Sequence, residues 1–345
     1  MLFSCAEPVE ITPEPTKAVF ENRGGDEVTV LFAGDTMLDD LALPFINANG
    51  YHYPVADLRP EISAADVAIV NMEVAAVRER CNRAHKKYAY NMLPDGLEAL
   101  KWAGYDAVIL ANNHTRDCGD KGLRQTIELC DQAGMYHLGA GTDLDMARRG
   151  LVFDIGGTKV GLLAYYGKGN FRSKGDQAPL ELDLIVPDVK RMRHYADVVI
   201  VHFHWGKNYK KNPTAKMQDI ARQTIDAGAH LIVGDGAHIL LPVGKIDGVP
   251  VIYSMGNGTF GTGNNRAEFA IMARVVIRDK ALDRVEFVPI HTQNRNPDVK
   301  FQTRLLDGET ARKVLDYLVD KSERRGADIE LSTDGQKPIG ILKNG

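Results

Sequence analysis

The chain has 345 residues, of which 44% are hydrophobic and 26% are charged, and its formal net charge is −4. This composition is typical of a globular protein with a substantial core. No stripe of lysine and arginine interleaved with aromatic residues is present, which argues against a nucleic-acid partner. The longest apolar runs, such as Val198 to Val201, have the length of a strand and are too short to cross a bilayer.

The first residues raise the question of a lipid anchor. The segment from Leu2 to Cys5 resembles a lipobox, in which a cysteine receives lipid after signal cleavage, and a chance match to so short a pattern is an equally good explanation. Residues 6–22 are rich in proline and glutamate, so residues 1–25 are predicted to be a disordered tether. We expect an extracytoplasmic protein, which a lipid on Cys5 would anchor to the membrane. A cytoplasmic location stays open as the alternative.

Cysteine usage does not decide the compartment. The four cysteines stand at positions 5, 81, 118 and 130, and no Cys-x-x-Cys pair is present, so a thiolate zinc site is not expected. If Cys5 carries lipid, three cysteines remain, and an odd number implies at least one free thiol.

Apolar runs of strand length alternate with amphipathic helical segments, which is the pattern of a layered α/β fold. In the first half, strands are predicted at 28–33, 66–71 and 106–111, and helices at 95–102 and 119–133. The segment 152–166 is predicted to be a hairpin that turns at Gly156-Gly157.

The second half repeats this scheme. The predicted strands are 197–203, 230–233, 249–254, 268–278 and 282–290, and the predicted helices are 214–227 and 308–325. Because the last twenty residues are polar, they are predicted to be loose. No linker interrupts residues 26–300, so they are predicted to form one domain, followed by a C-terminal helical extension over 301–345.

Polar side chains gather where six of the predicted strands end. They lie in the segments Gly34-Asp35, Asn71-Met72-Glu73, Asn112 to Asp117, His202-Phe203-His204, Gly234 to His238 and Ser254 to Asn257. Each has a structural explanation by itself, since Asp caps helices and Asn forms turns. Together they indicate one site, because the carboxyl ends of strands converge in such folds. Carboxylate, imidazole and amide oxygen suit Mn²⁺, Fe²⁺, Zn²⁺ or Mg²⁺. Two such ions about 3.5–4 Å apart are a common clamp for hydrolysing phosphate esters or amides.

The ordered segments GDTM, NME, ANNHTRDCGDKGL, HWG, GxxAH and YSMGN resemble the CapA family of poly-γ-glutamate capsule synthesis proteins. That family belongs to the calcineurin-like metallophosphatase superfamily. The resemblance covers residues 28–295. It implies an α/β fold of four layers, αββα, in which two mixed sheets lie face to face with helices outside.

The resemblance also implies roles for particular residues. The implied metal ligands are Asp35, Glu73 as the bridging carboxylate, Asn113 through its side-chain oxygen, His204 and His238. His114 would be a general acid or would hold the oxyanion, and Asp117 would orient its imidazole. One or two divalent transition-metal ions (manganese, iron or zinc) are implied as cofactors.

Three departures from the family pattern bear on this site. Gly236 stands where a histidine is usual, Lys207-Asn208 follows HWG in place of a pair ending in glutamate, and Gly258 replaces an aromatic residue. We therefore expect that one metal position keeps its ligands, while the other is weakened or is rebuilt with Asp235, with His202 as an additional imidazole.

Three functions remain open at this point. The first is synthesis, export or processing of an anionic γ-glutamyl polymer, with membrane-bound polymer-synthesis proteins as partners. The second is a metal-dependent phosphoesterase acting on a small phosphorylated substrate, and the third is a binding module without catalysis, which the missing histidine favours. Lys207, Lys210 and Lys211 suit a polyanion and are equally well explained as a solvated loop.

Overall fold

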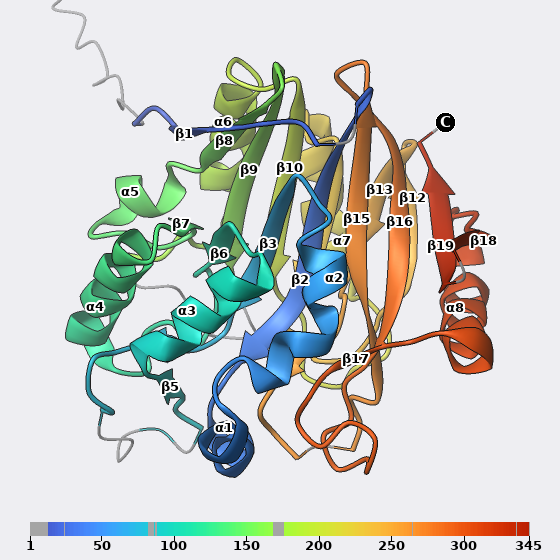
Figure 1. Cartoon of the computed structure of the whole chain (residues 1–345). Helices are drawn as coiled ribbons and strands as arrows, with labels where there is room; N and C mark the ends of the chain where they lie inside the picture. The colour runs from blue at the N-terminus through green and yellow to red at the C-terminus, as the bar shows by residue number, and fades with distance from the viewer. Residues whose placement is uncertain are drawn as a thin grey trace, which may run out of the picture.

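A computed structural model of the chain describes residues 13–23, 25–81, 86, 88–167, 176–263, 265–335 and 337–344. Two mixed β-sheets lie face to face and carry helices on their outer sides (Figure 1). The αββα arrangement implied by the resemblance is therefore confirmed. The lipobox segment lies outside the described residues.

The first sheet has seven strands in the order β1-β8-β9-β10-β11-β13-β12. Their bounds are β1 Thr16–Phe20, β8 Leu151–Ile155, β9 Thr158–Tyr166, β10 Val198–His204, β11 Leu231–Asp235, β12 Val243–Ile246 and β13 Val249–Ile252. β8 and β9 pair antiparallel around Gly156 and Gly157, which both have positive φ, so the predicted hairpin is confirmed. β9, β10 and β11 run parallel, and this brings their carboxyl ends to one edge.

The second sheet has the order β18-β19-β16-β15-β2-β3-β6-β7, with β14 paired to β2 and β17 to β16. Its strands are β2 Glu27–Met37, β3 Val67–Met72, β6 Ala107–Ile109, β7 Tyr136–Leu138, β14 Asn257–Phe260, β15 Phe269–Arg278, β16 Ala281–His291, β17 Arg304–Leu305, β18 Glu330–Asp334 and β19 Lys337–Lys343. β4 Ala75–Ala76 and β5 Asn91–Met92 form a separate short pair. β2, β3 and β6 are parallel, so their carboxyl ends also meet.

The helices cover both outer faces. On the second sheet lie α1 Leu43–Asn49, α2 Arg59–Ile62, α3 Pro94–Ala103 and α4 Gly119–Gln132, with 3₁₀ turns at Asp40–Ala42 and Tyr53–Leu58. On the first sheet lie α5 Leu144–Arg148, α6 Leu182–Met192 and α7 Ala215–Asp226. The helix α8 Gly308–Glu323 contributes Val314, Leu315 and Leu318 to the core between the sheets.

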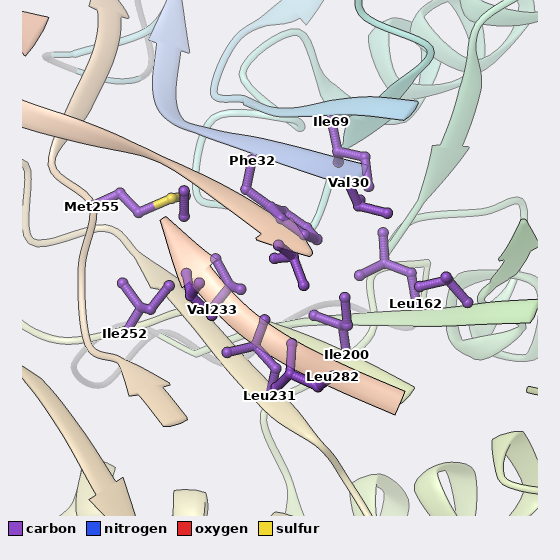
Figure 2. Packing of buried hydrophobic residues seen from close by; sticks show 14 of the residues in the cluster. Val30, Phe32, Ile69, Leu162, Ile200, Leu231, Val233, Ile252, Met255 and Leu282 are labelled. Carbon is purple, nitrogen blue, oxygen red and sulfur yellow. The ribbon is translucent and has the colours of Figure 1, made fainter. Parts of the chain in front are cut away.

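The alternation of side chains along β2 shows why the fold has layers. Val30 and Phe32 point into the core between the sheets, whereas Leu31 and Ala33 join the core beneath the helices. Figure 2 shows Val30 and Phe32 facing Leu162 and other apolar side chains of the first sheet. Because strands buried on both faces read as continuous apolar runs, sequence alone locates them but does not assign their faces.

Two expectations about the ends of the chain are wrong. Residues 16–20, placed in the predicted tether, form β1, which pairs in parallel with β8 and buries Ala18. The predicted loose tail instead forms β18 and β19, and β19 pairs antiparallel with β16. Ile339 and Leu342 are buried and Ile341 is partly buried, whereas most side chains of the edge strand β18 are exposed.

A buried ion pair fastens α5 to α6. Arg148 Nε and Nη2 donate to the two carboxylate oxygens of Asp188 at 2.9 and 3.0 Å, and both side chains are almost fully buried. The hydroxyl of Tyr165 also donates to Asp188, at 2.9 Å. Arg148 therefore links α5 to α6 beneath the first sheet's helices.

We predict that Arg148→Met lowers the free energy of unfolding by about 3 kcal/mol, because it leaves a buried carboxylate without its main partner. Arg191 Nη2 lies 3.5 Å from Asp188 Oδ1 and compensates part of the carboxylate charge. We therefore expect a loss of unfolding free energy near the low end of the range for broken buried ion pairs. Arg312→Ala, which removes an exposed pair with Asp316, is the control and should lose less than about 1 kcal/mol. Equal losses in urea unfolding would contradict this role.

Candidate metal centre

The predicted site residues come from the carboxyl ends of both sheets. Asp35 lies near the end of β2, Glu73 directly follows β3, and His204 is the last residue of β10. The close approach of β2 to the segment before β14 depends on Gly34, since a β-carbon there would lie 2.1 Å from the carbonyl oxygen of Gly256. That contact lets the amide of Asp35 donate to Gly256 and fixes the carboxylate in place.

Asp35, Glu73 and His238 form a buried cluster. One ligand atom from each lies within 4.8 Å of the others. His238 Nδ1 is 2.9 Å from Asp35 Oδ2 and 3.7 Å from Glu73 Oε2. His238 has a φ of 58°, a strained conformation for a non-glycine residue and one often found at functional sites. Two carboxylates and an imidazole form a donor set that fits a divalent transition metal.

Asn113 and His204 lie on the Oε1 side of Glu73, whereas His238 lies on the Oε2 side. His204 Nε2 is 2.8 Å from Asn113 Oδ1 and 3.7 Å from Glu73 Oε1. The two oxygens of Glu73 therefore face two different sets of residues. This is the arrangement expected of a bridging carboxylate.

His114 and Asp117 are adjacent to this second set. His114 Nδ1 donates to Asp117 Oδ2 at 2.6 Å, and its Nε2 lies 3.7 Å from Glu73 Oε1. Burial lowers the pKa of His114 to about 4 against the opposing effect of Asp117, so the ring is neutral near pH 7. Asp117 also accepts from the amide of Tyr90 and from Lys86. All seven residues predicted for the site are thus brought together.

Sequence reasoning assigned no role to the amides that hold these residues. Asn71 Nδ2 lies 2.7 Å from Asp35 Oδ1 and 3.0 Å from His204 Nδ1. Asn112 Nδ2 donates to Asn71 Oδ1, and Asn112 Oδ1 accepts from the amide of His114. Both asparagines stand in the quoted motifs, but their roles depend on strand register, in which Asp35 lies opposite Asn71.

Three aromatic rings pack against the histidines. Tyr90 lies 4.5 Å from His114, Phe260 lies 4.9 Å from His238, and Tyr166 lies 5.8 Å from His204, measured between ring centroids. The rings restrict the orientations of the imidazoles. The family pattern has an aromatic residue at the position of Gly258. In this chain the aromatic residue Phe260 follows two positions later.

The position of the missing histidine is closed to a side chain. Gly236 has a φ of 96°, and a β-carbon there would lie 2.7 Å from the carbonyl oxygen of Trp205 and 3.1 Å from His204 Nε2. Its amide donates to Asp35 Oδ2 at 3.2 Å. At this position the chain supplies a backbone donor and no imidazole.

Asp235 and His202 form a pair of their own. His202 Nε2 lies 2.9 Å from Asp235 Oδ2, and both residues are fully buried. Burial raises the pKa of Asp235, as do the charges of Asp35 and Glu73, and burial lowers the pKa of His202 to about 3. Asp235 is not part of the cluster with Asp35, Glu73 and His238.

A disulfide between Cys81 and Cys118 secures the chain beside Asp117. Cys130 is buried with a free thiol. The pairing joins residues 37 apart and was not predicted, because spacing alone does not give connectivity.

We predict that Cys81→Ser/Cys118→Ser lowers the free energy of unfolding by about 2–4 kcal/mol, because it releases a closed loop in the unfolded state. Denaturant unfolding with and without reductant provides the control. Reductant should destabilise the wild type to the level of the variant and leave the variant unchanged. A wild type insensitive to reductant would contradict the role of the bond.

The αββα architecture is a metallophosphatase-like fold. A solved structure titled as a novel phosphatase from Mycoplasma pneumoniae superposes with a TM-score of 0.51 at 16% identity, covering 80% of this chain and 97% of that one. At this identity the match shows the fold alone.

Residues 29–262 match the family described as bacterial capsule synthesis protein PGA_cap, and the chain belongs to this family. It is 25% identical over 292 residues to a Bacillus anthracis protein named capsule biosynthesis protein CapA, covering 81% of this chain and 71% of that one. It is also 25% identical over 279 residues to a Bacillus subtilis protein named PGA biosynthesis protein CapA, covering 79% and 73%. A Mycobacterium tuberculosis protein named probable polyglutamine synthesis accessory protein is 29% identical over 213 residues, covering 57% and 56%.

Proposed function

We propose that this protein is a metal-dependent hydrolase that acts on an anionic γ-linked glutamate polymer during capsule synthesis, export or processing. The observation that carries this proposal is the buried cluster of Asp35, Glu73 and His238 at the carboxyl ends of the strands. Manganese, iron or zinc suits this donor set. When bound, the ion supplies Lewis acidity, which activates water and polarises the carbonyl group of an amide.

The residues beside the cluster support proton transfer. Asp117 accepts the Nδ1 proton of His114, so the imidazole is oriented with Nε2 towards Glu73. In our proposal His114 Nε2, which carries no proton in the neutral ring, takes a proton from the attacking water and then gives it to the nitrogen of the leaving group. Lys86, which donates to Asp117 and to the carbonyl oxygen of Asn113, steadies this orientation.

A loop rich in lysine lies next to His238. The amide of Tyr209 donates to Ala237, and the Tyr209 ring lies 6.1 Å from that of His238. Lys207, Lys210 and Lys211 of the same loop are exposed. Positive charge at the entrance of a site raises the local concentration of an anionic substrate. We infer that this loop attracts the polymer.

The proposed location is outside the cytoplasmic membrane, where a capsule polymer is assembled. No helix in the described part of the chain is long and apolar enough to cross a membrane. The Cys81–Cys118 disulfide supports the location, because disulfides persist in oxidising compartments. Membrane-bound polymer-synthesis proteins are the proposed partners. Blocking free thiols in intact cells should leave both cysteines unmodified, and modification of both would argue for a reducing compartment.

We predict that the manganese-loaded protein shortens poly-γ-glutamate, as followed by size-exclusion chromatography and release of new amino groups. Asp35→Asn should lower the rate by about 100-fold or more, since it removes a charged metal ligand. Arg312→Ala is the folded control and should keep full activity. Cleavage of p-nitrophenyl phosphate without shortening of the polymer would favour a phosphoesterase. Metal-independent polymer binding without cleavage would favour a binding module.

We also predict that Lys207→Gln/Lys210→Gln/Lys211→Gln raises KM for the polymer roughly tenfold at low salt and leaves kcat unchanged. The reason is that these charges attract the anionic polymer to the site and take no part in the chemical step. The matched control replaces exposed lysines at the far ends of the sheets and on α8, Lys159→Gln/Lys280→Gln/Lys313→Gln. The two triple variants lose the same net charge. Equal effects on KM would show that overall charge, and not this loop, attracts the substrate.

A further inference from the structure

The two sides of Glu73 differ in the hydrogen-bonding character of the atoms around each histidine. On one side, His238 Nδ1 faces acceptors, namely Asp35 Oδ2 at 2.9 Å, Asn257 Oδ1 at 3.1 Å and Glu73 Oε2 at 3.7 Å. Oxygens of this kind cannot donate, so a cation is the natural occupant of the space between them. When Nδ1 binds an ion, the other ring nitrogen keeps the proton of the neutral imidazole.

On the other side, His204 Nδ1 lies within hydrogen-bond distance of a donor, whereas the nearby acceptor, Asp35 Oδ1, is farther away at 3.5 Å and already receives an N–H of Asn71. Asn71 Nδ2 lies 3.0 Å away, so Nδ1 accepts and the ring proton is on Nε2, where it points at Asn113 Oδ1 at 2.8 Å. An ion bound at Nε2 would move that proton to Nδ1, directly against the N–H of Asn71. Two opposed donors in a fully buried place are unfavourable, because neither has an acceptor there.

Asn71 cannot relieve this conflict by turning over its amide. Asn71 Nδ2 also donates to Asp35 Oδ1 at 2.7 Å, and Asn71 Oδ1 accepts from Asn112 Nδ2 at 3.0 Å. The amide of Asn112 is fixed in turn, because its Oδ1 accepts from the backbone amides of His114 and Thr115. A flip of Asn71 would set oxygen against oxygen at Asp35 and nitrogen against nitrogen at Asn112.

Among the residues that the structure describes, the second side has no replacement ligand. Gly236, where the family pattern has an imidazole, has no room for a side chain beside His204, and Asp235 is paired with His202. The remaining donors there are Glu73 Oε1, Asn113 Oδ1 and His204 Nε2. The first side also has three protein ligands, so the difference is that the third ligand here, His204 Nε2, carries the ring proton.

We propose that the site binds a single metal ion, held by Asp35, Glu73 and His238, and that Asn71 prevents a second ion by fixing the tautomer of His204. The His204–Asn113 pair then serves the substrate as hydrogen-bonding groups where a second ion would otherwise lie. This inference rests on the proposed metal-dependent function and names the occupancy of that same site.

The test counts ions on the full chain. Metal-free protein is titrated with Mn²⁺ or Co²⁺ by calorimetry, and the loaded protein is then analysed for metal content and by electron paramagnetic resonance. We expect one ion per chain and the spectrum of isolated Mn²⁺. His204→Ala should keep one ion, with a Kd changed by less than about tenfold, whereas His238→Ala and Asp35→Asn should weaken binding by about 100-fold or more. Circular dichroism of each variant checks that it is folded, and Asp35→Asn substitutes for His238→Ala if the latter does not fold.

The outcomes separate this inference from the proposed function. Two ions per chain with a spin-coupled Mn²⁺ signal would overturn the single-ion inference and leave the metal-dependent function standing. Loss of the ion in His204→Ala would overturn the inference as well. A wild type that binds no ion would overturn both.

Discussion

The site depends on the burial of two carboxylates side by side. Asp35 and Glu73 are both fully buried, and both approach His238. Negative charges removed from water and placed close together are unfavourable unless a cation or several donors compensate them. Asp35 receives donors from Asn71 and Gly236, and the imidazole of His238 faces both carboxylates. Much of the surrounding polar network, including the Asn71–Asn112 pair, follows from the need to hold these charges in place.

The fold creates this proximity through parallel strands. β2 and β3 of one sheet and β10 and β11 of the other end at the same side of the molecule (Figure 1). Gly34 lets the chain before β14 approach β2, and this brings Asn257 opposite Asp35. The apolar core between the sheets gives these strand ends a rigid support, as the packing of Val30, Phe32 and Ile69 against Ile200 and Leu231 shows (Figure 2). A metal site on strand ends is held more precisely than one on mobile loops.

Sequence predicted the residues of the site better than their hydrogen-bond partners. Asp35, Glu73, His204 and His238 each follow an apolar run, and that position is readable in a single chain. The partners are set by register between distant strands: Asn71 meets Asp35 across a strand pair, and its effect on His204 needs both sheets. Gly236 was recognised as a departure from the family pattern, but only the backbone shows that its φ and its neighbours exclude a side chain.

The errors at the chain ends have a common physical cause. β1 lies at a sheet edge and β19 lies next to the edge strand β18, and the chain before each of them is polar or rich in proline and glutamate. Such strands carry too weak an apolar pattern to be separated from loose chain, and their partners β8 and β16 supply the missing information. The disulfide was missed for a related reason, because connectivity is a property of the folded chain.

The most direct test of the account is anomalous diffraction from crystals grown with manganese or zinc, measured at the absorption edge of the metal. The account predicts one peak within coordination distance of Asp35, Glu73 and His238. No peak there, or a peak bound only by Asn113 and His204, would contradict it.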